Sequence, residues 1–460
     1  MTEKNRGKNM LNIGKELTQQ SKTVLSLPKE KTEKLRQAQE RDAKKYKLLR
    51  SIFLLDSHNN IRKNSIDNVT AILENDPIFK GAFKYNGFTQ ENEIVRNIPR
   101  LNIECGYFED AVIDMIAYYI ENQADYDHVL FSSQLIRSAI NVTCLNHSYN
   151  PVIDYFEKCL SKWDKKPRLK RIFTTYLGAE DSEVNHIIAI HFFSNAVAQV
   201  FEPGRKNDDT LDLVGKQGTG KTEFVRHMAP LGLYTDSFIT FDKPDDLNQF
   251  RLSFFVNDDE LAVSNKKSFD DVKKFASQVF ARFRPSYGHY LRTFKRRWSF
   301  VRTTNNLYYL RDLTGNRRFM PVLANKSNIK KSIFSMTDEE KEQLWGEAVY
   351  FYKKDITERK KNKDFKGILV FTPQQEKAVL QAQLQFTGSS SIEDQIDLLL
   401  NVTSFVGHDF IKSSDLAHEL NIDPVKDSKI MSSVNSIMIN KMNFKKAREN
   451  GIRGFKRVSS

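Results

Sequence analysis

Apolar residues recur with helical spacing through the first part of the chain. Phe108, Val112, Met115 and Tyr119 fall at intervals of four, three and four residues, which places them on one face of a helix. The run YNPVIDYFEKCLSKWDKKPRL opens with an Asn-Pro turn signal and predicts a further helix. We therefore expect residues 51–178 to form an α-helical N-terminal domain.

The pattern changes between residues 179 and 352, where short apolar runs alternate with helical stretches. The runs LDLVG, FFVND and FVRTTN are each bounded by turn residues and predict strands. Such alternation is typical of an α/β fold with the strands at the centre of one sheet. Polar side chains interrupt the most apolar stretch, residues 184–201, so it predicts a buried helix rather than a membrane span.

A Lys-rich segment, residues 353–389, reads as a linker to a last globular unit at 390–460. That unit predicts a helix over 413–420 and a second helix over 425–439. Two basic strands then meet at an Asn-Gly dipeptide, residues 450–451, which is a strong hairpin signal. Two helices followed by a basic hairpin predict a winged-helix domain, which binds either DNA or another protein.

The composition adds a charge preference to this picture. Lys and Arg together number 71 against 58 for Asp and Glu, a net charge of +13, which predicts a polyanionic partner. Residues 1–50 form a basic N-terminal arm, either a solvated helix or a segment that contacts DNA or another subunit. The three cysteines are too few and too irregularly spaced for a disulfide scaffold or a zinc cluster. No apolar segment opens the chain, so we expect a cytoplasmic protein without a membrane partner.

The sequence LDLVGKQGTGKT, residues 211–222, carries the strongest chemical signal. A strand, the pattern G-x-x-x-x-G-K-T and a helix follow one another, as in a P-loop that binds the phosphates of ATP. We expect Lys221 to reach the β- and γ-phosphates and Thr222 to ligate Mg²⁺. The predicted cofactor-binding residues are Gly215, Lys216, Gln217, Gly218, Thr219, Gly220, Lys221 and Thr222.

A second strand, LSFFVNDDEL, ends in three acidic residues. ATP hydrolysis needs a carboxylate on a neighbouring strand to hold the metal and a group to polarise the attacking water. We assign Asp259 to the metal and Glu260 to the water, and Asp258 could exchange roles with Asp259.

Two further motifs supply groups for phosphate chemistry. The strand SFVRTTNN ends at Asn305, whose amide can hydrogen-bond the γ-phosphate or the lytic water. Arg317 and Arg318 in TGNRRF suit an arginine finger supplied by a neighbouring subunit, and surface ion pairs are the alternative. A finger that acts in trans requires an oligomer.

Two basic segments are candidates for DNA contacts. Residues 281–298 mix Arg and Lys with Phe and Tyr around a turn, a pattern that can grip a phosphate backbone and stack on bases. A surface hairpin or a subunit contact is the alternative. We expect His289, Arg292 and Lys295 to face DNA. In the C-terminal hairpin the candidates are Lys441, Lys445, Lys446, Arg448, Arg453, Lys456 and Arg457.

Taken in order, YNPVIDYFEKCLSKWDKKPRL, LVGKQGTGKT, FFVNDDEL, RFRPSYG, RTTNN and LTGNRRFMPV resemble the virulence-associated protein E family of P-loop ATPases. The family is found in bacteriophages and pathogenicity islands, and the resemblance covers about residues 51–352. It implies an AAA+-like ATPase domain related to superfamily-three hexameric helicases, with the basic hairpin as the DNA-translocating element. The family's acidic motif reads more like ELDEL, and here Asn257 and Asp258 replace its first Glu and Leu.

The expected function is that of an ATP-dependent, hexameric DNA helicase and replication initiator in the cytoplasm of a bacterial host. Its partners would be the origin duplex, single-stranded DNA, further copies of itself and host replication proteins. Two alternatives remain at this stage. The protein could be an ATPase switch that loads a host helicase without unwinding DNA, or an origin-binding scaffold that uses ATP only for assembly.

Overall fold

The computed structural model describes residues 51–123, 126–285, 290–310, 316–387, 392–401, 403–420, 422–423, 427–449 and 451–458. The predicted basic arm, residues 1–50, lies outside the described residues. The chain divides into two compact units, Met1–Tyr149 and Asn150–Ser460.

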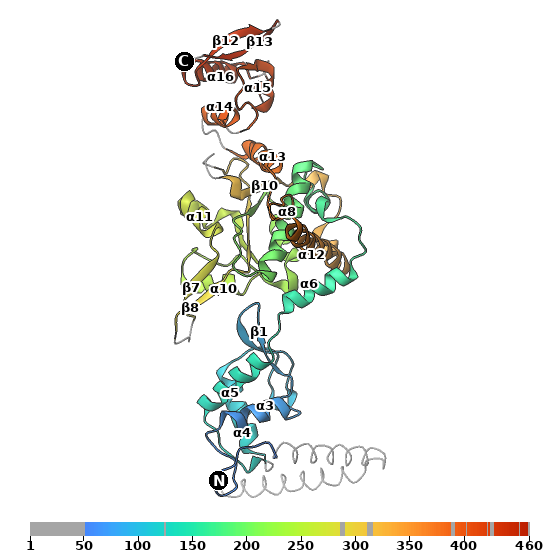
Figure 1. Ribbon diagram of the computed structural model, residues 1–460, viewed down its shortest axis with the longest axis vertical. Coiled ribbons are helices and arrows are strands. Elements are labelled where there is room, and N and C mark those ends of the chain that lie inside the picture. Colours follow the sequence, from blue (N-terminus) through green and yellow to red (C-terminus); the bar gives the residue numbers. More distant parts are fainter. Residues whose placement is uncertain are drawn as a thin grey trace, which may run out of the picture. The chain divides into compact units, whose positions relative to one another are not determined.

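The described part of the first unit combines α-helices with a small antiparallel sheet in the order β1-β2-β3 (Figure 1). Its elements are α3 (Ile66–Asn75), α4 (Asp110–Glu121), α5 (Ser133–Asn146), β1 (Phe83–Asn86), β2 (Glu91–Ile94) and β3 (Gly106–Tyr107). The predicted helical stripe lies on α4, where Val112 and Tyr119 are buried. The sequence predicted a helical domain and missed this small sheet, because strands of two to four residues are too short to display a period of two.

A five-stranded parallel sheet forms the centre of the second unit, in the order β10-β4-β9-β6-β5. Its strands are β4 (Thr210–Val214), β5 (Tyr234–Thr235), β6 (Phe255–Asp258), β9 (Ser299–Thr304) and β10 (Phe319–Leu323). The three predicted strands are β4, β6 and β9. All five residues of β4 and all six of β9 are buried, as expected of central parallel strands that helices cover on both faces.

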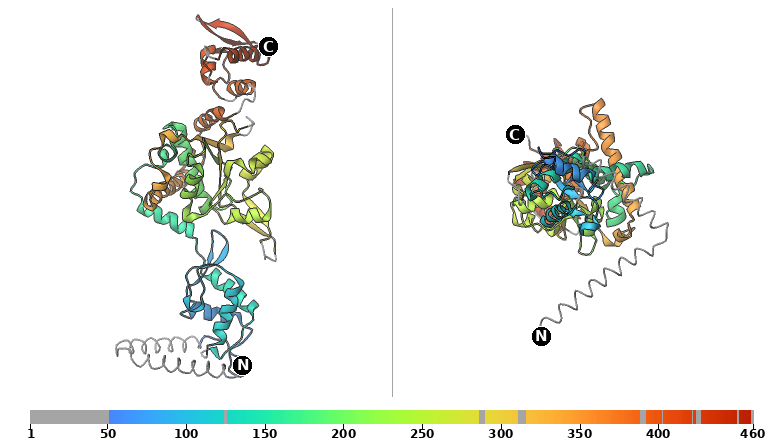
Figure 2. Two further views of the ribbon diagram at one scale, coloured as in Figure 1. Left: turned by 180° about the vertical axis from the view of Figure 1, so that it is seen from behind. Right: turned by 90° about the horizontal axis from the view of Figure 1, so that it is seen from below.

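Helices cover both faces of this sheet, as Figures 1 and 2 show. On one face lie α6 (Pro151–Lys162), α8 (Glu183–Phe201) and α12 (Asp338–Lys361). On the other lie α10 (Pro244–Arg251), α11 (Phe269–Ala276) and the hairpin of β7 (Phe280–Phe283) and β8 (Arg292–Lys295). The short helices α7 (Ile172–Leu177) and α9 (Lys221–Met228) precede and follow the P-loop strand in sequence.

The helix α8 was predicted to be buried, and the structure confirms it. Among the described helices it is long and apolar enough to cross a membrane by composition, but 67% of its most apolar window is buried inside the protein. Its polar residues His191, Asn195 and Gln199 make hydrogen bonds within the core. These bonds offset part of the free-energy cost of burying polar atoms in this helix.

The boundary predicted near residue 178 was wrong, because α6 packs against α12 in the second unit. The ring centroids of Phe156 and Trp345 are 5.1 Å apart, and the Lys162 ammonium is 2.7 Å from the Glu342 carboxylate. A Cβ atom on Gly346 would lie 2.5 Å from the carbonyl oxygen of Cys159, so only glycine permits this approach. These contacts join residues that are far apart in sequence, so no local sequence pattern shows that α6 belongs to the second unit.

The predicted Lys-rich linker, residues 353–389, was also wrong. Its first part completes α12, whose last turn carries Arg359, Lys360 and Lys361, cations that favour a helix C-terminus. Its second part includes α13 (Pro373–Gln383), and the Gln383 amide donates to the Phe319 carbonyl of β10. The many lysines of this segment therefore reflect mostly exposed positions on and between helices packed in the second unit, and they do not indicate a linker.

The C-terminal part of the chain has its own hydrophobic core and an antiparallel sheet in the order β11-β13-β12. Its elements are α14 (Ile392–Asn401), β11 (Phe410–Lys412), α15 (Ser413–Glu419), α16 (Ser428–Asn440), β12 (Phe444–Glu449) and β13 (Ile452–Arg457). The two helices and the hairpin lie where the sequence predicted them.

Candidate nucleotide-binding site

The P-loop connects β4 to α9, and its backbone requires glycine. Gly215, Gly218 and Gly220 have φ angles of 151°, 78° and 80°, in the region that L side chains rarely adopt. A Cβ atom on Gly215 would also lie 2.5 Å from the Ala324 carbonyl oxygen. The loop is therefore held against the segment that follows β10, with the N-terminus of α9 behind it.

The buried ammonium of Lys221 lies inside this loop. It donates to the Gly215 carbonyl at 2.8 Å and to Asn305 Oδ1 at 2.9 Å. The strands β4 and β9 are adjacent and parallel, so their C-terminal ends bring the predicted lysine and the predicted asparagine together. Burial lowers the pKa of Lys221, and Glu260 and Asp259 oppose this effect.

Two hydroxyl groups and one carboxylate meet beside the lysine. Asp259 Oδ1 accepts hydrogen bonds from Thr222 Oγ1 at 2.6 Å and from Thr303 Oγ1 at 2.5 Å. Hydroxyl and carboxylate oxygens are ligands that Mg²⁺ prefers. The donor set predicted for the metal, Thr222 and Asp259, therefore fits Mg²⁺.

The two aspartates at the end of β6 have different surroundings. The carboxylate of Asp258 is buried and accepts backbone N–H groups from Val263 at 2.9 Å and Ser264 at 2.8 Å. It thus holds the following loop, and Asp259 is the one that faces the P-loop threonine. This geometry favours Asp259 over Asp258 as the metal-side carboxylate.

Glu260 follows with a φ angle of 52°, a left-handed backbone conformation that is unusual for glutamate. Its backbone N–H donates to Thr303 Oγ1 at 3.1 Å, and its carboxylate accepts the Asn305 N–H at 3.1 Å. The side chain is exposed, next to Asn305 and at the same edge of the sheet as Lys221. Strained backbone of this kind is concentrated at functional sites.

The predicted finger arginines lie at the opposite edge of the sheet. Phe319, next to Arg318, pairs in register with the first residue of β4, whereas the P-loop follows its last residue. At about 3.3 Å per residue, the strand separates them by roughly 16 Å. Arg318 pairs with Asp208 at 3.2 Å. Arg317 is exposed, lines a cavity of about 270 Å³, and has no ion-pair partner among the described residues.

A buried charge network between β4 and β9 was not predicted. Asp212 and Arg302 lie opposite each other in register, and Arg302 Nε donates to Asp212 Oδ1 at 2.8 Å. Tyr309 also donates to this carboxylate from the loop that follows Asn305. The available signal was a charged residue inside each of two predicted central strands, LDLV and FVRTT.

The basic hairpin of β7 and β8 has cations in two different environments. Arg292 and Lys295 are exposed, whereas His289 lies outside the described residues. Arg296 is buried and donates to the carbonyl groups of Trp298 and Asn207, and its burial lowers its pKa to about 9. Arg296 therefore holds the base of the hairpin and leaves the exposed cations to meet a ligand.

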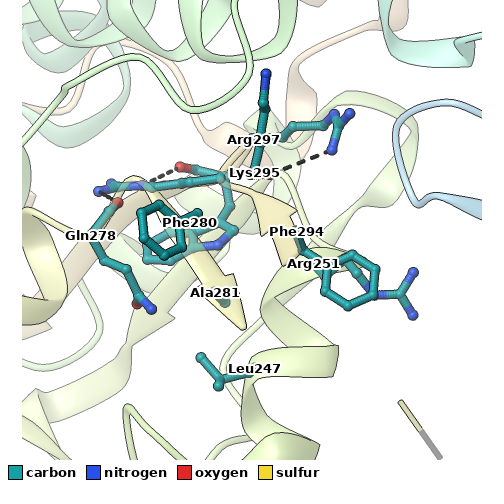
Figure 3. A pocket seen from close by; sticks show the side chains of 10 residues that line it. Leu247, Arg251, Gln278, Phe280, Ala281, Phe294, Lys295 and Arg297 are labelled. Carbon is teal, nitrogen blue, oxygen red and sulfur yellow. Dashed lines mark hydrogen bonds between the residues drawn. The ribbon is translucent and has the colours of Figure 1, made fainter. Parts of the chain in front are cut away.

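Side chains around the hairpin base line a small pocket (Figure 3). Phe294 is buried, and the guanidinium groups of Arg251 and Arg292 lie 4.9 and 5.1 Å from its ring centroid. Arg297 donates to the Lys295 carbonyl at 3.4 Å, and Phe280 is 53% exposed. The aromatic residues that line the pocket are Phe280, Phe294 and Trp298, and its cations are Arg251, Lys295, Arg296 and Arg297.

The C-terminal hairpin brings like charges together across its two strands. In the register of β12 and β13, Lys445 faces Lys456 and Arg448 faces Arg453. Like charges directly opposite each other destabilise a hairpin, and bound anions would relieve this repulsion. The exposed cations of this hairpin are Lys445, Lys446, Arg448, Arg453, Lys456 and Arg457. Within the set, Lys456 pairs with Glu449 at 2.9 Å, and the predicted Lys441 pairs instead with Glu393 of α14.

The fold and the site together define a parallel α/β protein with a P-loop between β4 and α9. More specifically, the chain belongs to the virulence-associated protein E-like domain family, whose sequence model matches residues 156–387, just over half of the chain.

Solved structures with a detectable likeness include three of the C-terminal region of NrS-1 in the apo state. They share 14%, 12% and 13% sequence identity with this chain, with TM-scores of 0.33, 0.33 and 0.30. Each comparison covers 82% of this chain and 96% of the other. No curated protein matches the sequence.

Proposed function

We propose that the second unit binds and hydrolyses ATP in the presence of Mg²⁺. The observation that carries this proposal is the meeting of Lys221, Thr222, Asp259, Glu260 and Asn305 at the C-terminal edge of β4, β6 and β9. In this proposal Lys221 and Asn305 hold the terminal phosphates, and Thr222 with Asp259 holds the metal, which would neutralise phosphate charge. Glu260 orients the attacking water and accepts its proton.

We further propose that each site is completed by a neighbouring subunit in a ring of six. Arg317 is the better finger candidate, because it is exposed while Arg318 is held by Asp208 and Ser277. The opposite placement of the P-loop and the arginines supports a head-to-tail contact, and such a contact repeated by rotation closes a ring.

DNA is the proposed partner, and the proposed activity is strand separation during replication initiation for a phage or pathogenicity island. The net charge of +13 and the exposed cations of the β7–β8 hairpin support a motor that grips a phosphate backbone. The like-charge pairs of β12 and β13 support reading the C-terminal part as a winged helix that binds the origin. Host replication proteins in the bacterial cytoplasm would bind the protein at this origin.

Strand displacement on a forked DNA duplex tests the motor. We expect unwinding by the full chain only with ATP and Mg²⁺, and a decrease in ATP turnover of at least about 100-fold for both Lys221→Ala and Glu260→Gln. Glu260→Gln should still bind ATP, because it keeps the phosphate-binding residues. If Lys221→Ala hydrolyses ATP at the normal rate, the proposed site is wrong.

The hairpin separates a motor from an ATPase switch that only loads a host helicase. The double variant Arg292→Ala, Lys295→Ala should lose unwinding while it retains basal ATP hydrolysis, because both side chains are exposed on the hairpin. Unwinding at the normal rate by this variant would contradict a translocating role. DNA-stimulated hydrolysis without any unwinding by the unmodified protein would favour the loader.

A further inference from the structure

We propose that Lys326 is a second phosphate-binding cation of the nucleotide site, an inference that rests on the proposed function. Its ammonium lies 3.9 Å from the position that a Cβ atom on Gly218 would occupy, at the apex of the P-loop. Lys326 belongs to the turn after β10, outside the P-loop motif. Lys221 approaches the phosphate site from inside the loop, and Lys326 would approach it from the open side.

The backbone around Lys326 is fixed on two sides. The Ala324 N–H donates to the Val214 carbonyl at 2.7 Å, and the Asn325 N–H donates to the Leu177 carbonyl at 2.8 Å. A Cβ atom on Gly178 would lie 2.1 Å from the Asn325 carbonyl oxygen, so the two backbones are in direct contact. The side chain of Lys326 therefore starts from a defined place beside the P-loop.

The charge of Lys326 is available for a ligand. The residue is exposed, and no carboxylate of the described residues lies within ion-pair distance of its ammonium. Lys331, a few residues along the same segment, differs because it pairs with Glu340. A bound nucleotide brings several negative charges to the loop, and an uncommitted ammonium at its apex would form a charge-assisted hydrogen bond with them.

Equilibrium binding of a fluorescent ATP analogue with Mg²⁺ to the full chain tests this inference. A charge-assisted hydrogen bond contributes enough that we expect Lys326→Ala to bind the analogue about tenfold more weakly. Lys326→Arg should bind within about twofold of the unmodified protein, because it keeps the charge. Lys330→Ala, an exposed lysine on the same segment, is the matched control and should have no effect.

Four outcomes separate this inference from the function on which it rests. If Lys221→Ala binds as tightly as the unmodified protein, the nucleotide site itself is wrong. If Lys221→Ala loses binding while Lys326→Ala does not, only the role of Lys326 is wrong. The role of Lys326 is supported if Lys326→Ala binds more weakly with a normal melting temperature and Lys326→Arg restores binding. If Lys330→Ala weakens binding equally, the effect is one of general charge and the role of Lys326 is wrong.

Discussion

Removing one member of the buried charge network should destabilise the second unit strongly. The side chains of Arg302 and Asp212 are only 3% and 1% exposed. Burial lowers the pKa of Arg302, but Asp212 opposes this effect and the net shift is upward, so the arginine stays charged. Arg302→Met would leave the carboxylate buried without its countercharge, at a cost of about 3–5 kcal/mol. In a domain of this size the melting temperature should fall by on the order of 10 °C.

Urea denaturation followed by tryptophan fluorescence would measure this free energy of unfolding. The exposed Arg282→Met is the matched control, and we expect it to change stability by less than about 0.5 kcal/mol. A triple variant, Asp212→Leu with Arg302→Met and Tyr309→Phe, removes every charged or hydroxyl group of the network and should recover much of the loss. The reasoning fails if Arg302→Met costs less than about 1 kcal/mol, or if the triple variant is no more stable than the single one.

Two further predictions address the aspartates and the thiols. Asp259→Asn should abolish Mg²⁺-dependent ATP hydrolysis with little change in melting temperature. Asp258→Asn should instead reduce the free energy of unfolding by about 1–3 kcal/mol, because the Asp258 carboxylate accepts two backbone N–H groups. The reverse pattern would show that the two aspartates have exchanged roles. Burial raises the pKa of Cys144 to about 12 and of Cys159 to about 11, so both remain protonated and unreactive at pH 8. The thiol reagent DTNB should therefore modify one exposed cysteine, Cys105, in the native protein and all three after denaturation, and rapid modification of a second would contradict the buried placement.

The residues of the P-loop site could be predicted because each belongs to a local pattern. Lys221 and Thr222 follow a strand and open a helix, and Asp259 and Asn305 each follow a buried strand. Parallel strands end at the same edge of a sheet, so the sequence order alone implied that these side chains meet. The choice between Asp258 and Asp259 needed the structure, since a shift of one residue turns a side chain to the other face of a strand.

Features that depend on distant contacts could not be predicted in this way. The strands β1 to β3 are stabilised by one another and by the core of the first unit, and they show no period of their own. Lys326 approaches the P-loop only because β10 lies beside β4, and no motif marks it. His289 and the basic arm lie outside the described residues, so the DNA contact predicted for His289 stays a prediction and both interpretations of the arm stay open.

The packing of α6 on α12 also determines the order in which the protein can fold during synthesis. The Lys162–Glu342 contact joins residues 180 positions apart. At about 5–20 residues per second, the ribosome needs roughly 10–40 seconds to make the intervening chain. The described residues of the first unit, 51–123 and 126–149, contact one another over much shorter sequence separations, so this part can fold as soon as it emerges. The apolar face of α6 around Phe156 must instead wait for Trp345. Nascent chains that stop before α12 would therefore expose an aromatic surface and be prone to aggregate.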